Sequence, residues 1–73
     1  MLSLVEANAG DCVILRDAGA GMLMLSRFGV KVGSRLCVVG KTLFGASIQL
    51  EYGDVRFFIR SSDAARMMVE VVV

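Results

Sequence analysis

The chain has 73 residues, of which 56% are hydrophobic and 21% charged, and its eight basic and seven acidic side chains leave a net charge of +1. This length predicts a single domain over residues 1–73 and excludes a two-domain enzyme. The apolar composition excludes intrinsic disorder. Because the charge is balanced, the sequence shows no excess of basic residues of the kind that binds nucleic acid or an anionic membrane.

The longest uninterrupted apolar runs, such as Met22–Leu25, have four residues, whereas a helix that spans a bilayer needs about 18 or more. The sequence therefore predicts neither a transmembrane helix nor a signal peptide, and no direct insertion into a membrane. With two cysteines and no secretory signal, we expect a cytoplasmic protein in which Cys12 and Cys37 stay reduced thiols.

Most segments between the glycines alternate apolar and polar residues with period two, which is typical of half-buried strands. The predicted strands are Asp11–Asp17, Ser34–Lys41, Ala46–Tyr52, Val55–Arg60 and Met67–Val73. Gly53 and Asp54 tolerate positive φ and predict a tight hairpin between the third and fourth strands. The residues of this hairpin that we expect to face the core are Ile48, Leu50, Tyr52, Val55, Phe57 and Ile59.

One helix is predicted over Ala20–Phe28, between the first two strands. Gly29 stands where a residue in the αL conformation ends a helix, and Val30 after it is placed to contact Leu25 in a Schellman motif. Before the last strand, residues 61–65 predict one helical turn with Ser61 as its N-cap.

The predicted helix places apolar side chains on two faces. Gly21, Met24, Leu25 and Phe28 share the side that we expect to dock on the sheet. Met22, Leu23, Ser26 and Arg27 lie on the opposite side. Because an exposed apolar patch usually marks an interface, Met22, Leu23 and Arg27 are candidate partner-binding residues, for another protein or for a second copy in a weak homo-oligomer. The alternative is that both faces of this helix are core.

A second candidate surface lies on the strand Val55–Arg60, where Arg56, Phe58 and Arg60 share one face. Two basic residues around an aromatic one resemble the strand faces with which some barrels bind oligonucleotides. The net charge of +1 favours a partner-facing protein surface, with oligonucleotide binding as the alternative.

The chain contains no histidine, which removes the usual general base and the commonest metal ligand. A zinc site would need Cys12, Cys37 and two carboxylates without any Cys-x-x-Cys pair. The carboxylates are scattered, and Gly19-Ala20-Gly21 is typical of a loop that enters a helix rather than of a phosphate-binding turn. We therefore expect no enzymatic activity, no cofactor and no metal site.

Together, the short strands and the early helix predict a mostly β protein, a small SH3-like barrel of five strands with a one-turn helix before the last strand. The segment Leu25-Ser-Arg-Phe-Gly29-Val-Lys-Val-Gly33 resembles the leucine-x-x-leucine-glycine-x-x-x-glycine signature of the FeoA family. Further similar segments, in chain order, are Leu4 with Gly10 and Val13, Gly45–Ile48, Ile59-Arg60 and Ala65–Glu70. The chain departs from the family pattern at Met24, where a basic residue is usual, and at Val32 and Ser47, where proline is usual.

This resemblance implies a small cytoplasmic accessory protein of ferrous iron transport that binds the FeoB-type membrane transporter, which carries a cytoplasmic G domain. Similar domains also end the iron-dependent repressors of the diphtheria toxin repressor type, so the alternative is a metal- or ligand-binding domain of a metalloregulator. Because no DNA-binding segment precedes Met1 in the sequence, we expect the transport accessory rather than a repressor fragment.

Overall fold

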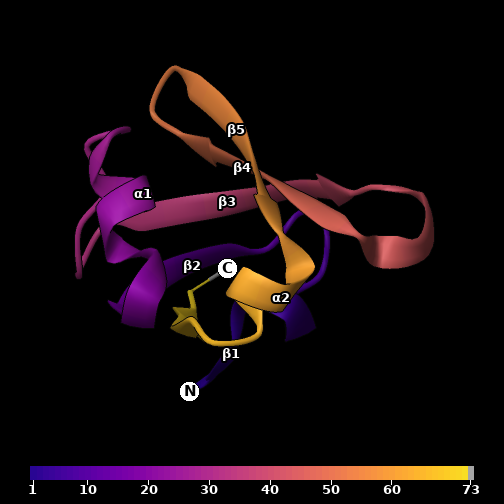
Figure 1. The fold of residues 1–73 in the computed structure, drawn as a ribbon, viewed down its shortest axis with the longest axis horizontal. Helices are drawn as coiled ribbons and strands as arrows, with labels where there is room; N and C mark the ends of the chain where they lie inside the picture. The colour runs from indigo at the N-terminus through magenta and orange to yellow at the C-terminus, as the bar shows by residue number, and fades with distance from the viewer. Residues whose placement is uncertain (73) are drawn as a thin grey trace.

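The computed structural model describes residues 1–72, apart from the side chain of Leu43, and consists mainly of one antiparallel sheet (Figure 1). Its six strands are β1 (Leu2–Ser3), β2 (Cys12–Asp17), β3 (Arg35–Lys41), β4 (Ser47–Tyr52), β5 (Val55–Arg60) and β6 (Met68–Val71). The spatial order is β1-β6-β2-β3-β4-β5, and every neighbouring pair is antiparallel. The protein is thus mostly β. The predicted end of the last strand, Val73, lies outside the described residues.

The short helices occupy the connections. The helix α1 (Met22–Ser26) lies between β2 and β3, and α2 (Ser61–Ala64) lies between β5 and β6. Three 3₁₀ turns, η1 (Leu4–Glu6), η2 (Gly19–Gly21) and η3 (Leu43–Gly45), complete the described elements. Among the described residues, none of the helices has the length and hydropathy that a membrane span requires.

The sheet differs from the five-stranded barrel that the sequence predicts. It has a sixth strand, β1, which pairs with β6 through Leu2 opposite Val69 and Ser3 opposite Met68. The strands β1 and β5 stand at the two ends of the sheet and do not pair with each other, so the sheet is not closed. A strand of two residues has no detectable periodicity, which is why the sequence does not reveal it.

The hydrophobic core lies on one face of the sheet, under α1 and α2. Its fully buried larger side chains are Leu4, Val13, Leu15, Leu25, Val30, Leu36, Val38, Ile48, Leu50, Met67 and Val69. In the β4–β5 hairpin, Phe57 and Ile59 are also buried, and Tyr52 is half-buried. Val55 is exposed, contrary to the prediction, because it adjoins the turn at Gly53, where the hairpin extends beyond the core.

The end of α1 has the predicted Schellman geometry. Gly29 adopts φ +82°, its N–H donates to the carbonyl of Ser26 at 3.0 Å, and the N–H of Val30 donates to the carbonyl of Leu25 at 3.2 Å. The helix itself is shorter than predicted, because Gly19 adopts φ +54° and the glycine-containing segment Gly19–Gly21 forms a 3₁₀ turn instead.

The helix α2 begins differently from the prediction. Arg60 is its N-cap residue, and no side chain caps the helix. The hydroxyl of Ser61 instead donates to the carbonyl of Gly45, while its backbone N–H donates to the carbonyl of Ala46 at 3.0 Å. Ser61 therefore ties the start of α2 to the segment that precedes β4.

Candidate partner-binding surfaces

The helix α1 exposes fewer apolar side chains than predicted. Leu25 is fully buried, and Leu23 on the opposite side is 77% exposed. Met22 is half-buried and packs against the core, so the prediction that it faces away is wrong. The reason is that the helix begins at Met22, after a 3₁₀ turn, so positions counted from Ala20 at helical spacing are shifted. The outward surface of α1 is therefore Leu23 with the exposed Arg27.

The residue Phe28 does not enter the core as predicted. It is partly exposed, and its ring stacks on the ring of Phe57 with centroids 4.3 Å apart and planes 4° apart. This contact joins the turn after α1 to the inner, core-facing side of β5. Stacked aromatic pairs of this kind add about 0.5–1.5 kcal/mol beyond the burial of their area.

The strand β5 presents Arg56, Phe58 and Arg60 on its other side, which we call the outer face. All three are exposed, and Phe58 is 57% exposed, whereas Phe57 and Ile59 between them are buried. Arg56 Nε lies 2.9 Å from Glu51 Oε2 on β4, and Arg60 Nε lies 3.2 Å from Asp63 Oδ2 on α2. The alternation in the sequence places these three side chains together.

The structure does not bring the two predicted sets of residues together. Leu25 and Phe28 pack α1 and its C-terminal turn against the inner side of the sheet, while Arg56, Phe58 and Arg60 point from the outer face. No hydrogen bond or ion pair connects the two sets among the described residues. The protein therefore offers two separate candidate surfaces, one on α1 and one on β5.

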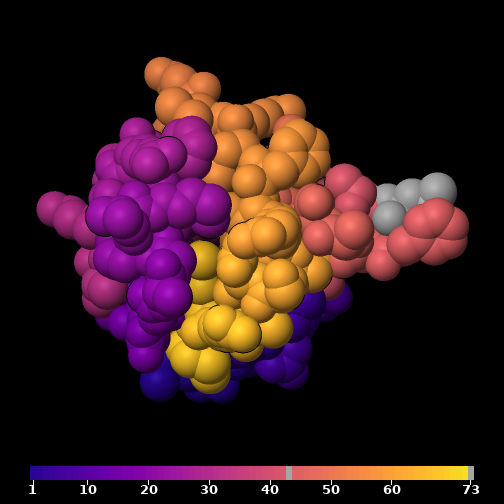
Figure 2. Space-filling view, in the orientation of Figure 1, coloured from indigo at the N-terminus to yellow at the C-terminus, as the bar shows by residue number. Residues whose placement is uncertain are grey.

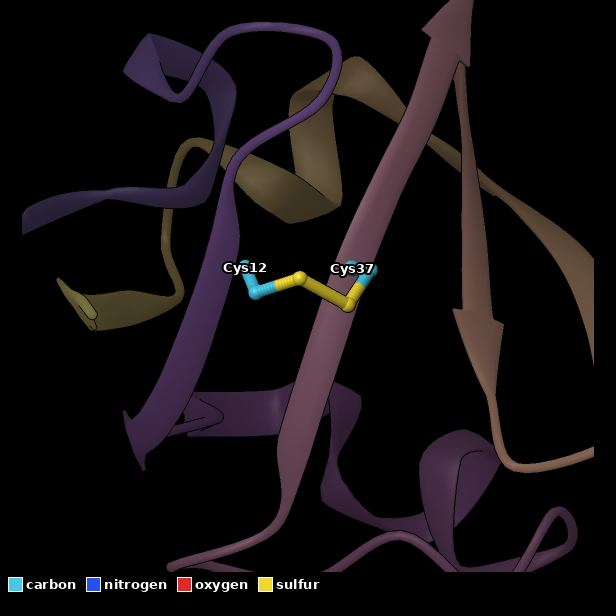
Figure 3. The surroundings of a disulfide bond; sticks show 2 residues. All are labelled: Cys12 and Cys37. Atoms are coloured by element: carbon cyan, nitrogen blue, oxygen red, sulfur yellow. A yellow bond between two sulfur atoms is a disulfide. The ribbon is translucent and has the colours of Figure 1, made fainter. Parts of the chain in front are cut away.

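A disulfide joins Cys12 of β2 to Cys37 of β3 (Figure 3), which contradicts the prediction of two free thiols. The two residues stand directly opposite each other, with their Cα atoms 4.0 Å apart. The N–H of Val38 donates to the carbonyl of Asp11 at 2.8 Å, so Cys12 and Cys37 form a non-hydrogen-bonded pair, the position at which side chains on antiparallel strands come closest. Register between strands this far apart in sequence is not readable from composition.

The disulfide belongs to the same face of the sheet as Arg56. Cys37 is opposite Glu51 on β4, and Glu51 is opposite Arg56 on β5. The neighbours of Cys12 and Cys37 along their strands, among them Val13 and Leu36, point to the core. One row across the outer face thus contains the disulfide and the Glu51–Arg56 ion pair.

A further exposed residue, Phe44 in η3, has no role in the sequence-based prediction. It is 95% exposed, and at φ 68° it is the sole residue other than glycine with positive φ within the described part of the chain. The segment that contains it projects at the right of Figure 2. An aromatic residue in a short apolar stretch is usually core, so the sequence carries no signal for this exposure.

The described residues form no cluster of three or more histidine, cysteine, aspartate or glutamate side chains that could hold a metal ion. In this same part of the chain the carboxylates Glu51, Asp63 and Glu70 form ion pairs with arginines, Glu70 with Arg16 at 2.7 Å.

The fold is shared with solved structures of FeoA proteins. The crystal structure of an iron uptake regulatory protein (FeoA) superposes with a TM-score of 0.82 and 27% identity, covering 97% of this chain and 96% of that chain. The NMR structure of a FeoA-like protein from Clostridium acetobutylicum has a TM-score of 0.79 and 21% identity, covering 99% of this chain and 87% of that one.

A protein solved with bound Zn²⁺ has the same fold in part of its chain. The crystal structure of ScaR with bound Zn²⁺ has a TM-score of 0.81 and 27% identity, covering 99% of this chain but 37% of ScaR. None of the curated proteins matches this chain. The model of the FeoA domain matches residues 2–71, and the protein therefore belongs to the FeoA domain family.

Proposed function

We propose that this protein is a small accessory and regulatory protein of ferrous iron transport, which acts in the cytoplasm by binding a FeoB-type membrane transporter at its G domain. The observation that carries the proposal is the match to the FeoA domain over residues 2–71, nearly the whole of the 73-residue chain. In this proposal the protein acts by binding alone and catalyses no reaction.

The exposed surfaces support a role in binding another protein. Leu23 on α1 and Phe58 on β5 are large apolar side chains that the fold leaves in contact with solvent. Each has an exposed arginine nearby, Arg27 at the C-cap of α1 and Arg56 on β5. Phenylalanine and arginine are both enriched in protein interfaces.

Affinity capture tests the proposal. The tagged protein is incubated with detergent-solubilised membranes of its own source, with GDP or with a GTP analogue, and the captured proteins are identified by mass spectrometry. We expect the FeoB-type transporter to be captured, and then to bind directly as a purified protein. A purified transporter that fails to bind in either nucleotide state contradicts the proposal.

A second candidate function is a metal- or ligand-binding domain of the metalloregulator type. It is favoured by the similarity to ScaR, whose structure contains bound Zn²⁺ and of whose chain this protein covers 37%. Calorimetric titration of the reduced and the oxidised protein with Zn²⁺ or Fe²⁺ distinguishes the two. One stoichiometric submicromolar site, together with no binding to the transporter, would favour this second function.

A further inference from the structure

The strand β5 is a free edge of the sheet. It stands last in the strand order and pairs along its whole length with β4 alone, from Ser47 opposite Arg60 to Tyr52 opposite Val55. In Figure 1 it runs from the hairpin turn towards α2, which continues directly from it. An edge strand displays unpaired backbone N–H and C=O groups, which are a template for another strand.

The register identifies which backbone groups face the free edge. In an antiparallel ladder, hydrogen-bonded and non-hydrogen-bonded pairs alternate. The N–H of Ser61 donates to the carbonyl of Ala46 at 3.0 Å, which fixes the alternation, so Ile59 and Phe57 bond to β4 and the residues between them do not. The N–H groups of Arg56, Phe58 and Arg60 therefore point away from β4, and within residues 1–72 they have no other backbone partner.

The same three residues carry the exposed side chains of the outer face. The arginine side chains of Arg56 and Arg60 are 60% and 79% exposed, respectively. Each forms its ion pair through Nε, and among the described residues their Nη groups make no hydrogen bond. The edge thus combines unpaired backbone groups with side chains in the order basic, aromatic, basic. Both arginines retain N–H donors that can bind a further carboxylate.

We propose that the free edge of β5 binds an extended segment of a partner protein as an added strand, and that this segment places acidic, apolar and acidic side chains opposite Arg56, Phe58 and Arg60. Backbone hydrogen bonds to the edge supply affinity in this mode of recognition, and alternate side chains supply specificity. The inference deepens the proposed function and rests on it for the identity of the partner, the transporter.

Charge complementarity favours an acidic partner over a second copy of the chain paired about Phe58. Two β5 strands paired antiparallel about Phe58 would place Arg56 directly opposite Arg60 of the second copy, and like charges directly opposite each other destabilise a sheet. A strand with two carboxylates at these positions forms two ion pairs instead. An acidic segment therefore fits this edge, whereas a second β5 in that register does not.

A synthetic peptide tests the edge without the transporter. The probe is the capped peptide Thr-Glu-Thr-Val-Thr-Glu-Thr, and its control replaces both glutamates by lysine. With the probe at about ten times its Kd, we expect amide hydrogen exchange at Arg56, Phe58 and Arg60 to slow roughly tenfold, because binding protects the N–H groups in proportion to occupancy. Phe57 and Ile59, already bonded to β4, should change little. No saturable effect, or equal binding of the lysine peptide, would overturn the proposal.

Two pairs of variants separate the backbone contribution from that of the side chains. Phe58→Pro removes one edge N–H that β4 does not use, and Phe58→Thr removes the ring but retains the N–H. We expect the proline variant to bind the peptide about 2- to 10-fold more weakly than the threonine variant, the effect of one hydrogen bond. Equal binding by two folded variants contradicts strand addition.

If the proline variant does not fold, substitution of the two arginines tests the proposal instead. The double change Arg56→Gln with Arg60→Gln should weaken binding of the acidic peptide by about 2- to 20-fold, as expected for two exposed ion pairs. The matched control is Arg35→Gln, an exposed arginine on β3, which should bind like the wild type. Equal loss in the control and in the double variant would contradict the proposed site.

The transporter assay then distinguishes the two proposals. If the wild type binds the purified transporter and the β5 variants bind it equally well, the edge proposal is wrong and the proposed function stands. If the acidic peptide protects the edge amides but the wild type does not bind the transporter, the proposed function is wrong and the edge remains a strand-binding site for another acidic partner.

Discussion

The ring of Phe28 lies parallel to the ring of Phe57, with 4.3 Å between their centroids. Phe28 lies within the turn that follows α1, and Phe57 stands near the middle of β5, so this one contact couples the helix to the edge strand β5. The Schellman bond from Val30 to the carbonyl of Leu25 holds that turn in place.

Truncation of Phe28 should therefore destabilise the fold although its side chain is partly exposed. We expect Phe28→Ala to lower the free energy of unfolding by about 1–3 kcal/mol, from lost apolar burial and lost stacking. The matched control is Phe58→Ala, which removes a more exposed ring on β5 and should change the free energy of unfolding by about 0.5 kcal/mol or less. Urea denaturation followed by circular dichroism measures both, and equal losses would show that the Phe28–Phe57 stack contributes nothing specific.

Gly29 tests the C-terminus of α1. At φ +82° a β-branched residue is strained, so Gly29→Val should cost about 1–2 kcal/mol or more. The cost is conformational rather than steric, because a Cβ at Gly29 would lie 3.8 Å from Tyr52 Cε2, an ordinary contact. Gly40→Ala is the control, since this glycine lacks positive φ and a Cβ there meets nothing within 4 Å. A melting temperature for Gly29→Val equal to that of the wild type would mean that the helix end adjusts without strain.

The two apolar residues at the start of α1 should behave differently. Met22 packs against the core, so Met22→Ser is expected to lower stability by about 1–3 kcal/mol. Leu23 is 77% exposed, and Leu23→Gln should leave stability within about 0.5 kcal/mol of the wild type. If the α1 surface binds the transporter, Leu23→Gln reduces capture at unchanged stability. Unchanged capture by this variant would remove α1 from the interface and leave β5 as the remaining candidate.

Reduction of the Cys12–Cys37 disulfide should lower the free energy of unfolding, but the sheet should stay folded. The bond links residues separated by 25 positions, and a loop of about this length corresponds to roughly 3 kcal/mol of unfolded-state entropy. Urea denaturation with and without dithiothreitol gives the difference, and thiol trapping with mass spectrometry reports the redox state. The double variant Cys12→Ala with Cys37→Ala is the control and should not respond to dithiothreitol. A wild-type protein with two alkylatable thiols before reduction would contradict the disulfide.

The elements that the sequence predicts well depend on local chemistry. Strand β5 has the predicted bounds, Val55–Arg60, because alternation and the Gly53-Asp54 turn together determine both its ends. Gly29 adopts the predicted αL conformation because the αL C′ position strongly favours glycine. The outer face of β5 follows from the same alternation, so this candidate surface is readable from the sequence.

The features that the sequence does not predict depend on contacts between distant segments. The disulfide follows from the register of β2 against β3, and the strand β1 exists because two residues find a partner in β6. The sequence-based prediction places Met22 on the outward side of the helix because it applies helical spacing across the 3₁₀ turn η2. The exposure of Phe44 depends on how far η3 extends from the body of the protein, which no pattern of residue types encodes.

The disulfide also determines what a single break in the backbone does to the molecule. The chain between Cys12 and Cys37 includes all of α1 and the exposed residues Arg16, Arg27, Lys31 and Arg35, at which trypsin cleaves. A cut after any one of these leaves two pieces that remain covalently joined through sulfur. Such a nicked protein keeps the mass of one chain plus one water in the absence of reductant, and separates into two fragments when the bond is reduced.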